Sequence, residues 1–535
     1  MTILKLILYS IFSFILLRSS YFIYQSLHWP LEYCIDMVLM KFFAWSFDKG
    51  LYPYTDIFTY NLPVTIYINY FGLKLFGDTS FGFRLLDASW MLFFALVSYF
   101  YFRRLSFFAG FIGFVFTLLL PENATNFGAF QRETMILPFW ILALLSTESI
   151  IKNENKRWNF FLLGTYCIFS FLIKPTAILL FLGCQLNLFL YFIKSKKTIS
   201  YFKFNFLYFV LGSLFSLGVC VSPFLLKRNL IASTLSWFRY FIDLSNSLEI
   251  KSANLLLSQI FTFSLKDWNL PLNQPVVEYF TTGHLGIFHA LILFLFFVLY
   301  YLKKFNSSII ILLISSLGNY LIQGKGFAYH LFPLWFSIFA MCILILNYFL
   351  SITETGQNKI VKFIAIIGII FISLSLLSQQ NKSLRMYKNT GLFKGFSEEK
   401  KVLEKSLLLT KLDEITKKLS KTPIRIQVFE AYHSISLKAV MDLNLELVSK
   451  YPEAYIFYNE AKEMQKYKTD MMNSLASKPP DIIVINQEGT FQEKKDLFLS
   501  FPELKIFLNQ YKIESTILDL NNVTYQVFLK TQVVK

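Results

Sequence analysis

Long apolar runs recur through the first 380 residues and leave few choices of fold. A helix that crosses a bilayer needs about 20 mainly apolar residues, and eleven runs approach that length. They lie near residues 3–22, 85–102, 105–121, 135–151, 159–173, 176–193, 205–226, 284–302, 307–323, 331–350 and 361–378. We therefore expect a polytopic α-helical membrane protein with about 11 transmembrane helices.

Composition and charge agree with this class. The chain is 55% hydrophobic and only 16% charged, whereas soluble domains carry roughly 25% charged residues. The net charge of +17 stands largely in short basic clusters between apolar runs, where it orients a protein in a membrane. We therefore expect membrane lipids as partners and no nucleic acid. The five cysteines are scattered, so their spacing indicates neither a disulfide framework nor a zinc site.

The basic clusters predict the topology, because they fall in alternate loops. They are FRRL (102–105), KNENKR (152–157), KSKK (194–197), LKK (302–304) and ETGQNKIVK (354–362). Cytoplasmic loops carry an excess of Lys and Arg. This rule places the N-terminus inside and the C-terminal part outside, which requires an odd number of spans. We expect a multi-pass protein of the cytoplasmic membrane.

Two domains are expected. Residues 1–379 would form the transmembrane domain, with a first outer loop at 23–84 that contains two membrane-surface helices, 31–47 and 63–77. Residues 380–535 are more polar and would form a small extracytoplasmic α/β domain. Its strand-like runs are 424–430, 454–458, 481–485 and 525–530, and a helical pattern covers 398–419 with Leu403, Leu407, Leu408, Leu412, Ile415 and Leu419 on one face.

Charged residues gather on the predicted outer face. Carboxylates near hydrocarbon are costly and are therefore functional candidates, and Asp36, Asp56 and Glu133 all lie at outer span ends or in adjoining loops. Arg132, Lys174 and Lys325 lie on the same face, where topology does not call for positive charge. Transferring a sugar from a lipid phosphate to a hydroxyl needs such a set. A carboxylate takes the acceptor proton, and positive charge or a metal stabilises the departing phosphate.

The first outer loop resembles that of GT-C glycosyltransferases, in particular the bacterial relatives of protein O-mannosyltransferases and aminoarabinose transferases. The resemblance rests on one ordered set of residues. It comprises Asp36, Gly50, Pro53-Tyr54, Asp56, Pro63, Phe76-Gly77 and Arg84. Two departures are that Met37 stands where a second acidic residue is frequent, and that a single proline follows Asn61. The identity of the second carboxylate, Asp56 or Glu133, therefore stays open.

Later segments resemble the same family in the same order. They are QRETMILPFWILALL with Glu133, FLIKPTAILLF with Lys174, and QGKGFAYHLFPLW with Lys325, His330 and Pro333. The resemblance implies a polyprenyl-phosphate sugar donor and a lipid, glycan or protein acceptor at the outer face. It makes Asp36 the general base or the residue that orients the acceptor hydroxyl.

The other site residues follow from the same resemblance. Asp56 and Glu133 would shape the acceptor side or hold a cation, and a divalent metal is a candidate cofactor. Lys174, Lys325, His330 and Arg132 would bind the donor phosphate, and the displacement would invert the anomeric centre.

Two other classes of function fit a chain of this composition. A transporter or lipid flippase would also have many spans, but its site would lie near the bilayer midplane within internal repeats, and no repeat is evident. A non-catalytic scaffold of the cell envelope would account for the outer domain but would not need a carboxylate in the first loop.

Overall fold

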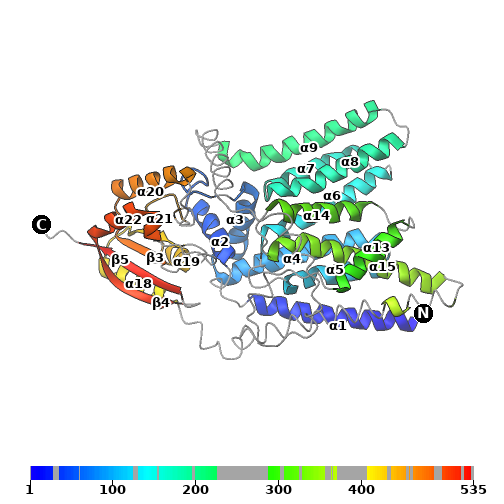
Figure 1. Ribbon diagram of the computed structural model, residues 1–535, viewed down its shortest axis with the longest axis horizontal. Coiled ribbons are helices and arrows are strands. Elements are labelled where there is room, and N and C mark those ends of the chain that lie inside the picture. The colour runs from blue at the N-terminus through cyan, green and yellow to red at the C-terminus, as the bar shows by residue number, and fades with distance from the viewer. Residues whose placement is uncertain are drawn as a thin grey trace.

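The structure is a computed structural model, and it describes most of the chain outside two long gaps. The described residues are 2–27, 35–59, 61–123, 130–152, 156–194, 199–225, 287–301, 307–323, 328–355, 359, 363, 366–369, 406–430, 435–452, 457, 462–486, 497–519 and 523–531. Helices run side by side on one side of Figure 1, with the N-terminus at their far end, and a sheet with its own helices lies on the other.

The bundle helices lie where the sequence predicts spans. They are α1 (Thr2–Ser26), α4 (Ser80–Arg103), α5 (Phe107–Asn123), α6 (Arg132–Ile151), α7 (Lys156–Phe171), α8 (Ile178–Lys194) with the short η3 (Pro175–Ala177) before it, α9 (Ile199–Leu225), α13 (Ile287–Tyr301), α14 (Ser308–Gln323) and α15 (Phe332–Thr355), which follows η5 (Ala328–Leu331). The predicted span at 361–378 falls mostly outside the described residues, so the count of eleven stays a prediction.

Length and composition show which of these helices are long and apolar enough to cross a membrane. Among the described residues there are four, Ser80–Arg103, Arg132–Ile151, Pro175–Lys194 and Phe332–Glu354. Shorter apolar helices cover Leu6–Tyr21, Phe107–Leu118, Asn205–Cys220 and Ser308–Gln323.

Three polar contacts lie at or near helix ends that the sequence places on the cytoplasmic side. Arg104 Nη1 lies 3.2 Å from Glu148 Oε2. Ser106 Oγ donates to Asn347 Oδ1 at 2.6 Å, and Ser307 Oγ donates to Asn187 Oδ1 at 3.0 Å. These polar links join α4 to α6, the turn between α4 and α5 to α15, and α8 to the start of α14.

Two helices of the first predicted outer loop lie between the bundle and the sheet (Figure 1). They are α2 (Ile35–Asp48) and α3 (Pro63–Phe76), and they pack against each other. Pro63 stands at the first position of α3, where a missing N–H costs nothing. The face of α3 that carries Phe71 and Leu75 is exposed, as a membrane-surface helix requires.

The structure encloses α2 more fully than the sequence suggests. Every residue from Met37 to Ser46 is buried, whereas a helix that lies on a membrane surface would expose one face. Even Lys41 is buried, and its ammonium pairs with Asp78 Oδ1 at 2.7 Å. α2 is therefore a helix inside the protein, and its apolar majority is explained by protein contacts.

The C-terminal part contains a five-stranded mixed sheet, which we call the α/β unit. Its elements are α18 (Leu407–Leu419), β1 (Arg425–Phe429), α19 (Ile435–Asp442), β2 (Glu446–Leu447), η7 (Lys462–Met464), α20 (Gln465–Ser477), β3 (Ile482–Asn486), α21 (Leu497–Ser500), α22 (Pro502–Phe507), η8 (Leu508–Gln510), β4 (Tyr511–Asp519) and β5 (Val523–Lys530). The strand order is β2-β1-β3-β5-β4. β1 is parallel to β2 and β3, whereas β5 is antiparallel to β3 and β4.

Three strands lie where the sequence predicts them, β1, β3 and β5. Of the predicted strand at 454–458 only Phe457 is described, and it lies in a 3₁₀ turn. Leu408, Leu412 and Ile415 form the buried face of α18, but Leu407 is exposed and does not belong to that face. The domain boundary at 379/380 falls outside the described residues and stays a prediction.

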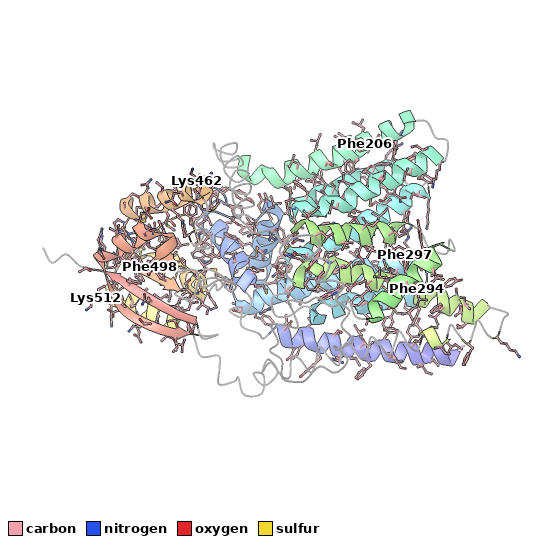
Figure 2. The ribbon with its side chains drawn as sticks, viewed as in Figure 1. Phe206, Phe294, Phe297, Lys462, Phe498 and Lys512 are labelled. Atoms are coloured by element: carbon pink, nitrogen blue, oxygen red, sulfur yellow. The ribbon has the colours of Figure 1, made fainter. Side chains whose placement is uncertain are left out.

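Surface side chains differ between the two parts, as Figure 2 shows. Phe294 and Phe297 on α13 are exposed, as lipid-facing residues are. Lys462 and Lys512 are exposed on the α/β unit. This distribution suits a bundle surrounded by hydrocarbon and an α/β unit surrounded by water.

Candidate active site

Asp36 lies at the start of α2, where the sequence places the base. It is in the first turn of the helix, whose positive dipole end stabilises a carboxylate. Its Oδ2 accepts a hydrogen bond of 2.6 Å from Gln131 Nε2, and the side chain is half-buried. Gln131 is the residue just before α6. The first and second predicted outer loops are therefore joined through Asp36.

Glu133 forms the centre of a buried polar cluster. It lies in the first turn of α6 and is almost fully buried. Its Oε1 forms an ion pair with Lys174 Nζ and lies 3.4 Å from His330 Nε2. Lys174 Nζ also donates to Gln323 Oε1 at 2.6 Å. We call Glu133, Lys174, His330 and Gln323 the polar cluster; it joins α6, the turn before η3, the end of α14 and η5.

The Lys174 turn is held in place from two sides. Lys174 has an extended backbone and immediately precedes η3. Thr176 Oγ1 donates to Asn319 Oδ1 on α14 at 2.5 Å. The Val64 N–H and Thr65 Oγ1 on α3 donate to the carbonyls of Leu172 and Ile173, at 3.3 and 3.4 Å. Because α3 and α14 both hold this turn, the backbone of Lys174 is fixed, and its ammonium stays against Glu133.

The charge of the polar cluster is finely balanced. Burying an ion costs several kcal/mol, and the cost is offset only by pairing and hydrogen bonds. Lys174 neutralises Glu133, while Glu133 Oε2 has no hydrogen-bond partner among the described residues. The Nζ of Lys174 is thus held in position by Glu133 and Gln323.

Asp56 is held in a separate place, within a tight turn between α2 and α3. The Tyr52 N–H donates to Asp56 Oδ2 at 2.9 Å, and the Asp56 N–H donates to the Tyr52 carbonyl at 2.9 Å. Gly50 and Tyr54 have positive φ, +78° and +73°. Tyr54 OH donates to the Asn61 carbonyl at 2.7 Å. The Gly-x-x-Pro-Tyr-x-Asp motif therefore encodes this turn.

The structure brings together some of the predicted site residues. Glu133, Lys174 and His330 are in direct contact. Asp36 reaches the same region through Gln131, and Arg132 is the first residue of α6. Lys325 lies outside the described residues. The roles of all seven predicted residues remain proposals.

Sequence reasoning missed the two amides that organise this region, Gln131 and Gln323. Neutral amides carry no charge signal, and glutamine is common in loops. The only local hint is position, since each lies within two residues of a predicted charged residue, in QRE and QGK.

The described residues contain no group of three or more His, Cys, Asp or Glu side chains placed to hold a metal ion. Glu133 offers a carboxylate, but the Lys174 ammonium already lies against it.

The comparison with protein families finds a match within the first loop and the bundle. Residues 61–226 match the family described as dolichyl-phosphate-mannose-protein mannosyltransferase. Over these residues the match agrees with the resemblance seen in the sequence. The matched segment includes Arg132, Glu133 and Lys174, whereas Asp36, Asp56, Lys325 and His330 lie outside it. No curated protein matches the chain.

Two solved structures show a weak overall likeness. The first is ArnT from Cupriavidus metallidurans in the apo state, at 12% identity and a TM-score of 0.42, with 92% of this chain and 93% of that one covered. The second is the oligosaccharyltransferase AglB from Archaeoglobus fulgidus in complex with an inhibitory peptide and a dolichol-phosphate. It has 11% identity and a TM-score of 0.41, with 93% of this chain and 70% of that one covered.

Proposed function

We propose that the protein is a membrane glycosyltransferase that moves a sugar from a polyprenyl-phosphate donor to a lipid, glycan or protein acceptor. The observation that carries the proposal is the contact path from Asp36 through Gln131 to α6 and the polar cluster. It places a carboxylate and a buried ammonium at the same end of the bundle. The match of residues 61–226 to a mannosyltransferase family supports the same reaction.

The outer membrane face is the proposed location of this reaction. The contacts join predicted outer loops from four parts of the chain: α2 to Gln131, Glu133 to Lys174, and Lys174 to Gln323 beside η5. Loops that meet this closely share one side of the membrane. Arg104, from one of the basic clusters, pairs with Glu148 in a separate contact at the other end of the bundle. A lipid donor in the cytoplasmic membrane would reach the polar cluster from the bilayer.

The proposed chemistry is a single displacement. The acceptor hydroxyl oxygen attacks the anomeric carbon while its proton passes to Asp36. The bond between that carbon and the phosphate oxygen breaks, and polyprenyl phosphate leaves with the electron pair. Gln131 holds one oxygen of the Asp36 carboxylate, which fixes the direction in which the base points. An attack opposite the leaving phosphate inverts the anomeric centre.

Lys174, His330, Lys325 and Arg132 are proposed to stabilise the charge on the departing phosphate. Preorganised cations in a dry site contribute strongly to such stabilisation, and Lys174 and His330 are both buried. In this proposal Glu133 keeps Lys174 in position before the donor arrives. Glu133 and Asp56 shape the acceptor side, and no step depends on a metal.

The test compares Asp36→Asn with a control from the same helix, Asp48→Asn. Asp48 pairs with Lys74 at the exposed end of α2, so its loss is expected to have little effect. Each variant and the wild type would be compared at matched membrane expression, using labelled polyprenyl-phosphate sugars. Release of free polyprenyl phosphate would be measured.

Wild type and Asp48→Asn are expected to release polyprenyl phosphate at similar rates. Asp36→Asn is expected to be at least about 100-fold slower, because positioned acid–base groups contribute about 10²–10⁴-fold. Equal release by Asp36→Asn would remove Asp36 as the base. No release by wild type with any donor of the pool would contradict the proposed transfer and would favour transport or a scaffold role.

A further inference from the structure

Phe58 is a bundle-side residue that belongs to the core of the α/β unit. It stands in the first predicted outer loop between α2 and α3, yet only 7% of its surface is exposed. The residues it packs among come from the α/β unit and include Phe429, Tyr451, Met464 and Tyr467. A large aromatic ring is therefore supplied to the α/β unit by a loop nearly 400 residues earlier in the chain.

The contacts of Phe58 are both polar and aromatic. Its backbone N–H donates to the Lys450 carbonyl at 2.6 Å. The ring centroid lies 5.3 Å from that of Tyr451 and 5.9 Å from that of Tyr467. The Lys450 ammonium lies 6.0 Å from the Phe58 ring centroid. This combination fixes position as well as burying apolar surface.

Phe58 is closely linked to the turn that carries Asp56. The Tyr54 N–H donates to the Ile57 carbonyl at 2.8 Å, and Tyr54 OH donates to the Asn61 carbonyl. These bonds leave little freedom between Phe58 and the residues that follow α2. Anchoring Phe58 therefore restrains the C-terminal end of the helix that begins with Asp36.

A second contact restrains α2 from the same side, because α19 packs against it. The start of α19 is itself fixed, since the Glu430 carboxylate accepts hydrogen bonds from the Ile435 and Ser436 N–H groups at 3.3 and 2.9 Å. The α/β unit thus contacts the first loop at α2 and at Phe58.

We infer that the α/β unit acts as part of the frame of the active site, and that Phe58 is a positioning residue that sets the orientation of α2 and so of Asp36. The kinetic part of this inference rests on the proposed function. The donor-phosphate residues Lys174 and His330 are carried by the bundle. Loosening Phe58 should affect the proton transfer at Asp36 far more than donor binding, because the Lys174 turn keeps its second support, the hydrogen bond from Thr176 to Asn319 on α14.

The structural test uses Phe58→Ala and the matched control Phe71→Ala. Phe71 lies in the same loop region on α3, but 65% of its surface is exposed. Hydrogen exchange of the amides in residues 51–62 would be followed in the full-length protein in lipid nanodiscs. Phe58→Ala is expected to speed this exchange at least about tenfold, with Phe71→Ala like wild type. Unchanged exchange in Phe58→Ala would overturn the anchoring, whether or not the protein is a glycosyltransferase.

The kinetic test separates positioning from general damage. Phe58→Ala is expected to lower kcat for polyprenyl phosphate release at least about tenfold while KM for the donor changes less than threefold. Phe58→Leu, which keeps an apolar side chain in the pocket, should recover much of the loss. An equal loss of kcat in Phe71→Ala, or a loss confined to KM, would overturn the positioning role.

A reversible cross-link gives an independent readout. Phe58→Cys combined with Lys450→Cys places thiols on two backbone segments that a hydrogen bond joins, and a disulfide can form only where the two Cα atoms lie within about 7 Å. The reduced double variant should show the same loss of kcat as Phe58→Ala, with little change in KM. Oxidation to the disulfide should restore kcat. Formation of the disulfide without any recovery would overturn the inference. Inactivity of wild type would count against the proposed function alone, because the exchange measurement does not depend on catalysis.

Discussion

At the scale of single residues, the Glu133–Lys174 pair dominates the energetics of the site. Both side chains are buried, and removing one partner of a buried pair leaves an uncompensated charge. The pair therefore combines a structural role with the proposed catalytic one. The two roles can be separated by substitution. The structural role requires only that no charge is left unpaired, whereas the proposed catalytic role requires the ammonium of Lys174 itself.

We predict that Lys174→Met lowers the free energy of unfolding by about 3–5 kcal/mol. Adding Glu133→Gln removes the orphaned charge, so the double variant should regain most of that stability. Neither variant should transfer sugar, because the ammonium is missing from both. Thermal unfolding in detergent, together with polyprenyl phosphate release, checks the two effects. A double variant as unstable as the single one would show that the pair is not the source of the loss.

Glu430 predicts a pH dependence for the α/β unit. Burial raises the pKa of the Glu430 carboxyl from 4.5 to about 7, against hydrogen bonds from Ser436 and Tyr525 that lower it. The folded state therefore binds the proton more tightly than the unfolded state. The stability that this provides is fully present below about pH 4.5 and is lost as the pH rises through about 7.

The expected loss is about 3 kcal/mol, at 1.36 kcal/mol for each unit of pKa shift. Hydrogen exchange of the β1 and β3 amides between pH 5 and 8, corrected for the intrinsic pH dependence of exchange, would measure it. Glu430→Gln cannot titrate and should flatten the profile in this window. A wild-type profile that matches the variant would contradict the prediction.

The residue scale is also where the sequence was least informative. Glu133 and Lys174 stood out because charge near hydrocarbon needs a reason, and His330 was found only through the resemblance to the glycosyltransferase family. Gln131 and Gln323 did not stand out, since an amide gains its importance only from the partner that the fold provides. Gln323 meets Lys174 across 149 residues. A single sequence gives no signal for a pairing at that separation.

At the scale of elements, two glycines bring α7 and α9 into backbone contact. A Cβ on Gly164 would lie 2.0 Å from the Phe209 carbonyl oxygen, and a Cβ on Gly212 would lie 2.0 Å from the Phe161 carbonyl oxygen. Small residues at such a crossing allow close packing in a membrane, where no hydrophobic effect drives helices together. The α7–α9 contact depends on the absence of these two side chains.

We predict that Gly212→Ala destabilises the bundle by about 1–3 kcal/mol, the usual cost of overpacking. Gly218→Ala on the same helix is the control, because a Cβ there meets nothing within 4 Å. Melting temperatures of the two variants in the same detergent would be compared. Equal melting temperatures would show that α7 and α9 can separate without cost.

Elements were predicted well where their pattern was long and apolar. The bundle helices follow from runs of spanning length, and β1 and β3 follow from short apolar runs such as DIIVI. β4 was missed because it is an edge strand with mostly exposed residues, so it lacks the continuous apolar run that marks β1 and β3. The enclosure of α2 was also missed, because hydrophobicity does not distinguish a lipid neighbour from a protein one.

At the scale of the whole molecule, the two ends of the bundle are chemically distinct. Among the described residues, one end carries the Arg104–Glu148 pair, and the other carries the polar cluster and the α/β unit. This asymmetry supports the predicted orientation, with the α/β unit outside the cytoplasmic membrane.

We predict that Lys512→Cys is labelled by a membrane-impermeant maleimide in intact cells, whereas Lys152→Cys is labelled only after the membrane is opened. Lys512 is exposed on the α/β unit, and Lys152 follows α6 in a predicted cytoplasmic loop. Cys167, Cys184, Cys220 and Cys342 are buried, so they should add little background, and Cys34 would be changed to Ala in every sample. The reverse labelling pattern would invert the topology.

The Phe58 contact has a practical consequence for anyone who wants the α/β unit as a soluble protein. A fragment that begins near residue 400 would lack the ring that fills its core, and would present an apolar hollow beside Tyr451 and Tyr467. Such a hollow favours self-association. A dimer of this fragment would then be an artefact of its boundary. A short peptide carrying residues 50–62 should dissociate the dimer by supplying Phe58.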